Sequence, residues 1–125
     1  MAANDGMASG YPDVLDRLRE IGLLEEQSLL AETSELFITD AASTLNAMQE
    51  AFASGDSGGL ERAAHRLKGA ALNLGVNSIA QPAKLLEENA RRGEFVGGPE
   101  AIATIERELA EVGRWLRDLA AHPPT

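Results

Sequence analysis

A regular spacing of apolar residues near the C-terminus constrains the fold of this chain more than any other feature. Apolar residues recur there at intervals of three, four, three, four and three, at Ile102, Ile105, Leu109, Val112, Leu116 and Leu119. Residues at this spacing share one face of an α-helix, because one turn takes about 3.6 residues. A second stripe has the same character and consists of Leu60, Ala64, Leu67, Ala71 and Leu74. Both segments are therefore predicted to be amphipathic helices that each bury one face.

Three further segments follow a helical pattern. A short helix is predicted to begin near Pro12 and to end before Gly22, with an apolar face of Val14, Leu15, Leu18 and Ile21. A long helix is predicted over residues 27–54, with core positions Leu30, Phe37, Ala41, Leu45, Met48 and Phe52. The third has Ile79, Ala83, Leu86 and Ala90 on its inner face. It begins either near Asn77 with a distorted first turn or near Pro82, and we favour the earlier start.

Short segments that contain glycine separate these helices. Residues 57–59 and 93–98 are interpreted as connections, and Asp56 or Ser57 is expected to cap the helix that follows. Short connections place consecutive helices antiparallel to one another. No segment alternates polar and apolar residues in the manner of a strand. The predicted fold is all-α, an antiparallel up-down-up-down four-helix bundle in which the short N-terminal helix covers one end.

Composition limits the domain organisation and the classes of partner. A chain of 125 residues with 44% apolar residues fits one domain, which we place at residues 11–121, between a disordered leader (1–10) and a tail (122–125). The chain has no cysteine, which excludes disulfides and thiolate metal sites. Its net charge of −9 argues against nucleic acid as a partner, because binding a phosphate backbone requires a basic surface. No signal peptide or membrane span is recognisable, so we expect a cytoplasmic protein.

The helix around residues 60–74 carries an unusual outer face. With about 100° of rotation per residue, His65 lies about 140° from the centre of the apolar stripe, so its imidazole should face solvent. Lys68 stands one turn along. Gly69 leaves the approach to the imidazole open, although a glycine inside a helix costs about 1 kcal/mol relative to alanine. Leu72 is apolar on the same exposed side, as expected of a surface that binds a partner.

The pattern His65-x-Leu67-Lys68-Gly69-x-x-x-x-Leu74-Gly75 resembles the signature of histidine-containing phosphotransfer (HPt) domains of two-component phosphorelays. The similarity in helix order and length extends over nearly the whole chain. It implies that His65 accepts a phosphoryl group from a receiver-domain aspartate and passes it to another receiver domain. It also implies that Lys68 helps to hold the phosphate and that Gly69 admits the partner.

The resemblance further implies a phosphocarrier and not an enzyme. Such a protein has no cofactor or metal of its own, because the Mg²⁺ and most of the catalytic groups belong to the partner receiver domain. The expected partners are response-regulator receiver domains and a hybrid histidine kinase. A monomer is favoured, since the other exposed faces are charged. Whether the chain is free-standing or a domain of a hybrid kinase stays open.

Several residues near His65 keep two interpretations. Lys68 by itself is either a solvated cation or a phosphate contact. In several HPt domains a glutamine 22 residues beyond the histidine orients the imidazole, and here that position holds Glu87. Glu87 is therefore either a surface carboxylate or a hydrogen-bond partner of the ring. Arg62 and Arg66 either form a solvated pair or meet an acidic rim on the partner.

Two other classes of protein also place a histidine on a helical bundle. In the dimeric core of histidine kinases an acidic residue follows the phosphorylated histidine, whereas Arg66 follows His65 here, and this length holds no ATP-binding domain. An adaptor bundle that has lost the chemistry would typically lose the histidine or the lysine. Both are present in this chain, which favours the carrier.

Overall fold

The computed structural model describes residues 10–122, and the regular structure in this range is helical, without strands. The elements in chain order are α2 (Pro12–Glu20), the 3-10 helix η1 (Leu23–Glu25), α3 (Gln27–Ser54), α4 (Ser57–Leu74), α5 (Asn77–Arg91) and α6 (Gly98–Ala121). The all-α prediction is confirmed. Residues 1–9 of the expected leader and 123–125 of the expected tail lie outside the described residues. None of the helices between residues 10 and 122 combines the length and apolar character that crossing a membrane requires.

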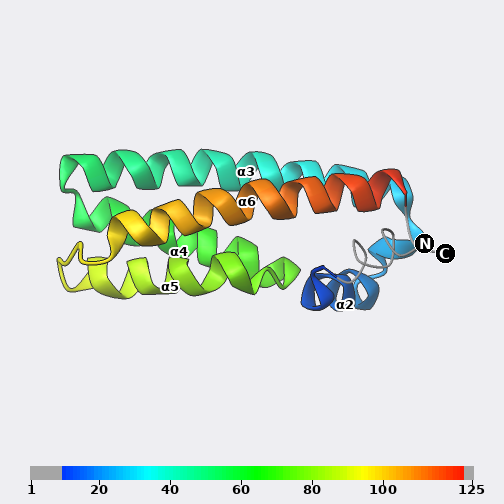
Figure 1. Cartoon of the computed structure of the whole chain (residues 1–125), viewed down its shortest axis with the longest axis horizontal. Helices are drawn as coiled ribbons and strands as arrows, with labels where there is room; N and C mark the ends of the chain where they lie inside the picture. Colours follow the sequence, from blue (N-terminus) through cyan, green and yellow to red (C-terminus); the bar gives the residue numbers. More distant parts are fainter. Residues whose placement is uncertain (1–9, 123–125) are drawn as a thin grey trace.

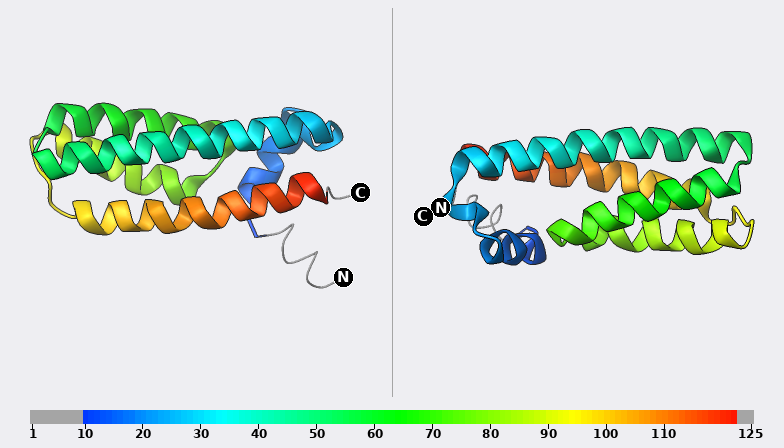
Figure 2. Two further views of the ribbon diagram at one scale, coloured as in Figure 1. Left: turned by 90° about the horizontal axis from the view of Figure 1, so that it is seen from above. Right: turned by 180° about the vertical axis from the view of Figure 1, so that it is seen from behind.

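Four long helices lie side by side along the long axis of the molecule (Figure 1). α3 packs against α4 and α6, and α5 packs against the same two helices, so α4 and α6 occupy opposite corners of the bundle. Successive helices run in opposite directions (Figure 2). This is the predicted up-down-up-down order.

The short helix α2 covers one end of the bundle, as the sequence predicts. α4 and α5 are shorter than α3 and α6, and α2 lies beyond the end of the shorter pair (Figure 1). Val14 and Leu18 of α2 are buried. Gly75, which ends α4 with a φ of +75°, allows this close packing, because a Cβ there would stand 2.9 Å from the backbone oxygen of Asp13. The position of α2 is thus fixed against the junction of α4 and α5.

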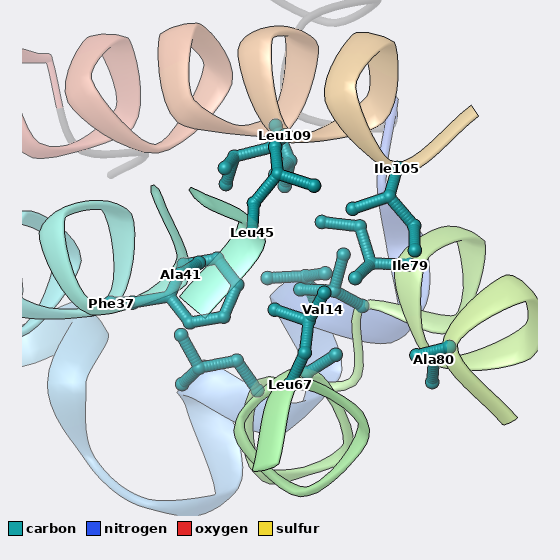
Figure 3. Close-up of a cluster of buried hydrophobic side chains, with 14 of the residues drawn as sticks. Val14, Phe37, Ala41, Leu45, Leu67, Ile79, Ala80, Ile105 and Leu109 are labelled. Carbon is teal, nitrogen blue, oxygen red and sulfur yellow. The ribbon is translucent and has the colours of Figure 1, made fainter. Parts of the chain in front are cut away.

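The inward faces of all the helices meet in one core (Figure 3). The complete apolar stripes of α4 and α6 are buried, as the spacing of their residues predicts. Side chains from five helices contribute to this core, among them Val14, Phe37, Ala41, Leu45, Leu67, Ile79, Ala80, Ile105 and Leu109 (Figure 3). Full burial of a leucine-sized side chain contributes about 1.5–3 kcal/mol, so the core fixes how each helix is rotated about its axis. It therefore also fixes which residues of α4 face outward.

The sequence-based prediction was wrong in three details. Residues 57–59 are not a connection but the first turn of α4, because the Asp56 carboxylate caps the helix by accepting a hydrogen bond from the Gly59 N–H at 2.9 Å. Phe52 is only partly buried, since it lies in the last turn of α3 at the end of the bundle. Ile21 is 46% exposed, because α2 ends before it and its side chain leaves the buried face.

The start of α5 agrees with the favoured alternative. The helix begins at Asn77, so Pro82 lies inside it. Proline has no N–H, and the backbone carbonyl four residues earlier therefore lacks its usual helical donor. All four predicted core residues of α5 are nevertheless buried, so the helix keeps its orientation.

Candidate functional site

His65 lies on the outer face of α4, near the middle of the helix. Its side chain is 68% exposed, because Ala64 and Leu67 take the buried positions of the same turns. Gly69 is exposed one turn later, and no atom lies within 4 Å of the place where a Cβ would stand. The surface beside the imidazole is therefore open to a partner.

The imidazole of His65 is hydrogen-bonded to a buried carboxylate from the neighbouring helix. Glu87 of α5 is only 2% exposed, and its Oε2 lies 2.6 Å from His65 Nδ1. The interpretation of Glu87 as a surface carboxylate was therefore wrong. The alternative, a hydrogen bond between Glu87 and the imidazole ring, is present in the structure. Because Nδ1 faces the protein interior, Nε2 across the ring is the nitrogen that a partner can reach.

Three side chains share the carboxylate of Glu87. Its Oε1 lies 2.6 Å from Lys68 Nζ, and its Oε2 also lies 3.2 Å from Arg91 Nη2. Arg91 forms a second ion pair, at 3.0 Å, with Glu61 of α4. A buried charge without such partners would be strongly destabilising. These cations therefore allow a carboxylate to lie beneath His65.

The environment of Glu87 changes its acidity. Burial raises the pKa of this carboxyl group, but the hydrogen bonds from Lys68 and His65, together with their positive charge, outweigh burial. The pKa of Glu87 consequently lies below its ordinary value of 4.5. The group is an ionised carboxylate at neutral pH.

Glu87 therefore links stability to pH. Because its pKa is lower in the folded than in the unfolded chain, the ionised group stabilises the fold above about pH 4.5, and this contribution is lost as the pH falls through the folded pKa. We expect Glu87→Gln to lower the free energy of unfolding at neutral pH, and the difference from wild type to shrink below about pH 4.5. Urea unfolding of both proteins across this range measures it. A difference that did not change with pH would contradict an ionised Glu87.

Two arginines flank His65 on the outer face of α4. Arg66 Nη2 lies 2.6 Å from Asp40 Oδ1 of α3, so it is an ion-pair partner and not simply a solvated cation. Arg62 is exposed and borders a hollow of about 420 Å³ beside His65, which Gly58, Glu61, Glu87 and Arg91 also line. Within residues 10–122, no group of three or more histidine, aspartate and glutamate side chains is arranged to hold a metal ion.

Two exposed leucines flank Gly69. Leu72 of α4 is 51% exposed, and Leu36 of α3 is 65% exposed. The contact between Arg66 of α4 and Asp40 of α3 shows which turns of these antiparallel helices lie side by side. Leu36 lies one turn before Asp40 on α3, and Gly69 lies about one turn after Arg66 on α4, so both are on the same side of this contact. The open surface beside His65 thus has an apolar border on both helices.

Leu36 and Arg91 were not identified from the sequence. Leu36 precedes the buried Phe37 and lies outside the buried face of α3. An apolar residue outside that face was the signal in the sequence that could have indicated a contact surface. Arg91 stands four residues after Glu87, a spacing at which opposite charges meet on a helix. In the structure Arg91 contacts both Glu87 and Glu61 beside His65.

Comparisons with known proteins agree on one family. The family model described as "Hpt domain" matches residues 32–115, a range that contains His65, Glu87 and all of their partners. Among solved structures, the chain is similar to histidine-containing phosphotransfer protein B (HptB) from Pseudomonas aeruginosa PAO1, with 33% sequence identity and a TM-score of 0.75. The match covers 89% of this chain and 93% of that chain. A comparison with curated proteins finds no match.

Proposed function

This chain belongs to the Hpt domain family of histidine phosphotransfer carriers, and we propose that it accepts a phosphoryl group on His65 from the aspartyl phosphate of one receiver domain and passes it to another. One observation carries the assignment of the residue. His65 is exposed beside an open surface while a buried carboxylate holds its Nδ1 at 2.6 Å. An accessible ring in a fixed orientation is what in-line attack on phosphorus requires.

Each neighbouring side chain has a part in the proposed transfer. Phosphoryl transfer depends mainly on positioning and on stabilising negative charge. Glu87 orients the ring, and the Lys68 ammonium, which also contacts Glu87, offers positive charge to the phosphoryl oxygens. Gly69 lets the receiver domain approach closely. His65 needs no additional base, because a neutral imidazole nitrogen is itself a nucleophile.

The proposed docking surface combines apolar and basic character. The receiver domain covers Leu36 and Leu72, with Gly69 between them, and Arg62 and Arg66 meet its acidic rim. Charge complementarity supports this orientation. α4 carries three cations and one carboxylate, although the chain as a whole has a net charge of −9. An acidic phosphorylation site would therefore meet the basic helix of an otherwise acidic protein.

The partner supplies what this chain lacks in the proposed reaction. We assign the Mg²⁺ and most of the catalytic groups to the receiver domain, which would be part of a hybrid histidine kinase or of a response regulator. The carrier acts as a monomer in the cytoplasm and contributes the nucleophile, its orientation and one cation.

Incubation with different phosphoryl donors tests this function. Mg²⁺ and ATP alone should leave the mass of the chain unchanged, whereas a phosphorylated receiver domain should add one acid-labile phosphoryl group. Chelating Mg²⁺ should slow the transfer at least tenfold, which corresponds to about 1.4 kcal/mol of lost transition-state stabilisation. Phosphorylation from ATP alone would contradict the proposal. Stable binding of many receiver domains without transfer would favour an adaptor.

A further inference from the structure

The hollow beside His65 is lined by one cation that no neighbouring carboxylate neutralises. Of the two arginines that line it, Arg91 is paired, and Arg62 has no ion-pair partner among residues 10–122. We propose that Arg62 binds the phosphoryl group of the free phosphorylated carrier and so shifts the transfer equilibrium toward the carrier. The inference rests on the proposed function, because it needs a phosphoryl group on His65. It concerns the carrier after the receiver domain and its Mg²⁺ have left.

Arg62 and His65 border the same open space. They lie one turn apart on α4, and both line the hollow of about 420 Å³. Side chains of a helix lean toward its N-terminus, so the imidazole lies over the turn that carries Arg62. The guanidinium lies over the first turn of α4, where a Cβ on Gly58 would stand 3.4 Å from Arg62 Nη1. A group attached to the ring therefore has room beside this guanidinium.

Lys68 and Arg62 lie on different sides of His65. Lys68 follows the histidine by three residues and Arg62 precedes it by three, which places them about 60° to either side of His65 around the helix. Lys68 takes the side of α5, where Glu87 contacts both Lys68 Nζ and His65 Nδ1 at 2.6 Å. Arg62 takes the side of α3 and also lines a groove between α3 and α4. A phosphoryl group on Nε2 points away from Glu87 and is thus accessible to Arg62.

The charges around the hollow also favour Arg62. Lys68 and Arg91 contact Glu87, and Arg91 contacts Glu61 as well, so these two cations and two carboxylates are neutral together. Lys68 can approach the phosphoryl oxygens only as far as its contact with Glu87 allows, because a buried carboxylate that loses a partner is strongly destabilising. Phosphorylated side chains carry about −1.5 to −2 charges at neutral pH. The unpaired charge of Arg62 is available to offset this increase.

A guanidinium suits the geometry of the phosphoryl group. Its planar fork of N–H groups can donate two parallel hydrogen bonds to two phosphoryl oxygens. No covalent bond forms or breaks at Arg62. The contact lowers the free energy of the phosphorylated carrier relative to that of the phosphorylated receiver, which moves the equilibrium toward the carrier.

The transfer equilibrium is the first test, because it separates this contact from docking. Contacts made only in the complex change the rates in both directions by the same factor and leave the equilibrium between the separate proteins unchanged. Arg62→Gln should lower the equilibrium constant for phosphorylation of the carrier about fivefold, the upper end for one exposed ion pair. An unchanged constant in this variant would overturn the inference and leave the carrier function standing.

Two other arginines provide matched controls for this measurement. Arg66 adjoins His65 but is paired with Asp40 at 2.6 Å, so Arg66→Gln should slow transfer in both directions and leave the equilibrium constant unchanged. Arg107 is exposed on α6, at the opposite corner of the bundle, and Arg107→Gln should change neither quantity. An equal fall of the constant in all three variants would mean that only the net charge matters, which contradicts a contact specific to Arg62.

The second test needs no receiver domain. Phosphoramidate, a small chemical donor, loads the histidine directly, and ¹H–¹⁵N spectra record the Nε–H groups of the arginines. The signal that Arg62→Gln lacks identifies Arg62. Loading of the wild type should shift this signal more than those of Arg66 and Arg107, and the same treatment of His65→Gln should leave it in place. If the Arg62 signal did not respond to loading, the inference would fail even where transfer between receivers proceeds normally.

Discussion

Replacing His65 with glutamine is expected to abolish the acceptance of a phosphoryl group from a receiver domain. Glutamine offers no nucleophilic nitrogen, although it can still donate a hydrogen bond to Glu87. The fold should be retained, because the His65 side chain is 68% exposed and the ion pairs with Lys68 and Arg91 still hold Glu87. Intact-mass measurement after incubation with a phosphorylated receiver, together with a thermal melt, checks both expectations.

The second histidine of the chain provides a matched control. His122 follows α6, is exposed, and has no assigned role. His122→Gln should accept a phosphoryl group at the rate of the wild type. Acceptance by His65→Gln, or its loss in His122→Gln, would mean that the phosphoryl group is carried elsewhere.

Gly69→Leu is expected to slow transfer at least tenfold while leaving the chain as stable as before or more so. Nothing lies within 4 Å of a Cβ at this position, and replacing a helical glycine with a good helix former adds up to about 1 kcal/mol of stability. The new side chain would occupy the open surface between Leu36 and Leu72, where the receiver domain docks. Single-turnover transfer rates and urea unfolding measure the two effects.

Ala110→Leu is the control for added bulk. Ala110 is exposed on α6, which occupies the corner of the bundle opposite α4. This variant should transfer at the wild-type rate. If Gly69→Leu also transferred normally, the receiver domain would not approach His65 across Gly69.

The bundle itself follows from the spacing of apolar residues. The stripes of α4 and α6 are buried without exception, because an amphipathic helix has only one face that it can turn toward a core. The exposure of His65 follows from the same geometry, since Ala64 and Leu67 occupy the inner side of the helix. Helix rotation was therefore predictable, and with it the outer face of α4.

The buried state of Glu87 was not predictable in the same way. Glutamate is almost never fully buried unless it is paired, and pairing depends on how two helices meet. Arg91 stands four residues after Glu87 on the same helix, but Lys68 reaches the carboxylate from α4, and no local pattern specifies that contact. The sequence analysis also missed the first turn of α4. Gly58 and Gly59 resemble a connection, and the cap from Asp56 compensates for their low helix propensity.

The passage of a phosphoryl group through His65 is the central claim, and one two-step measurement tests it most directly. The wild-type chain is incubated with a phosphorylated receiver domain from the same organism, the modified residue is mapped by tandem mass spectrometry at neutral pH, and a second, unphosphorylated receiver is then added. We predict one acid-labile phosphoryl group on His65, which disappears from the chain and appears on the second receiver. A phosphoryl group on another residue, or none from a broad set of receivers, would contradict the account.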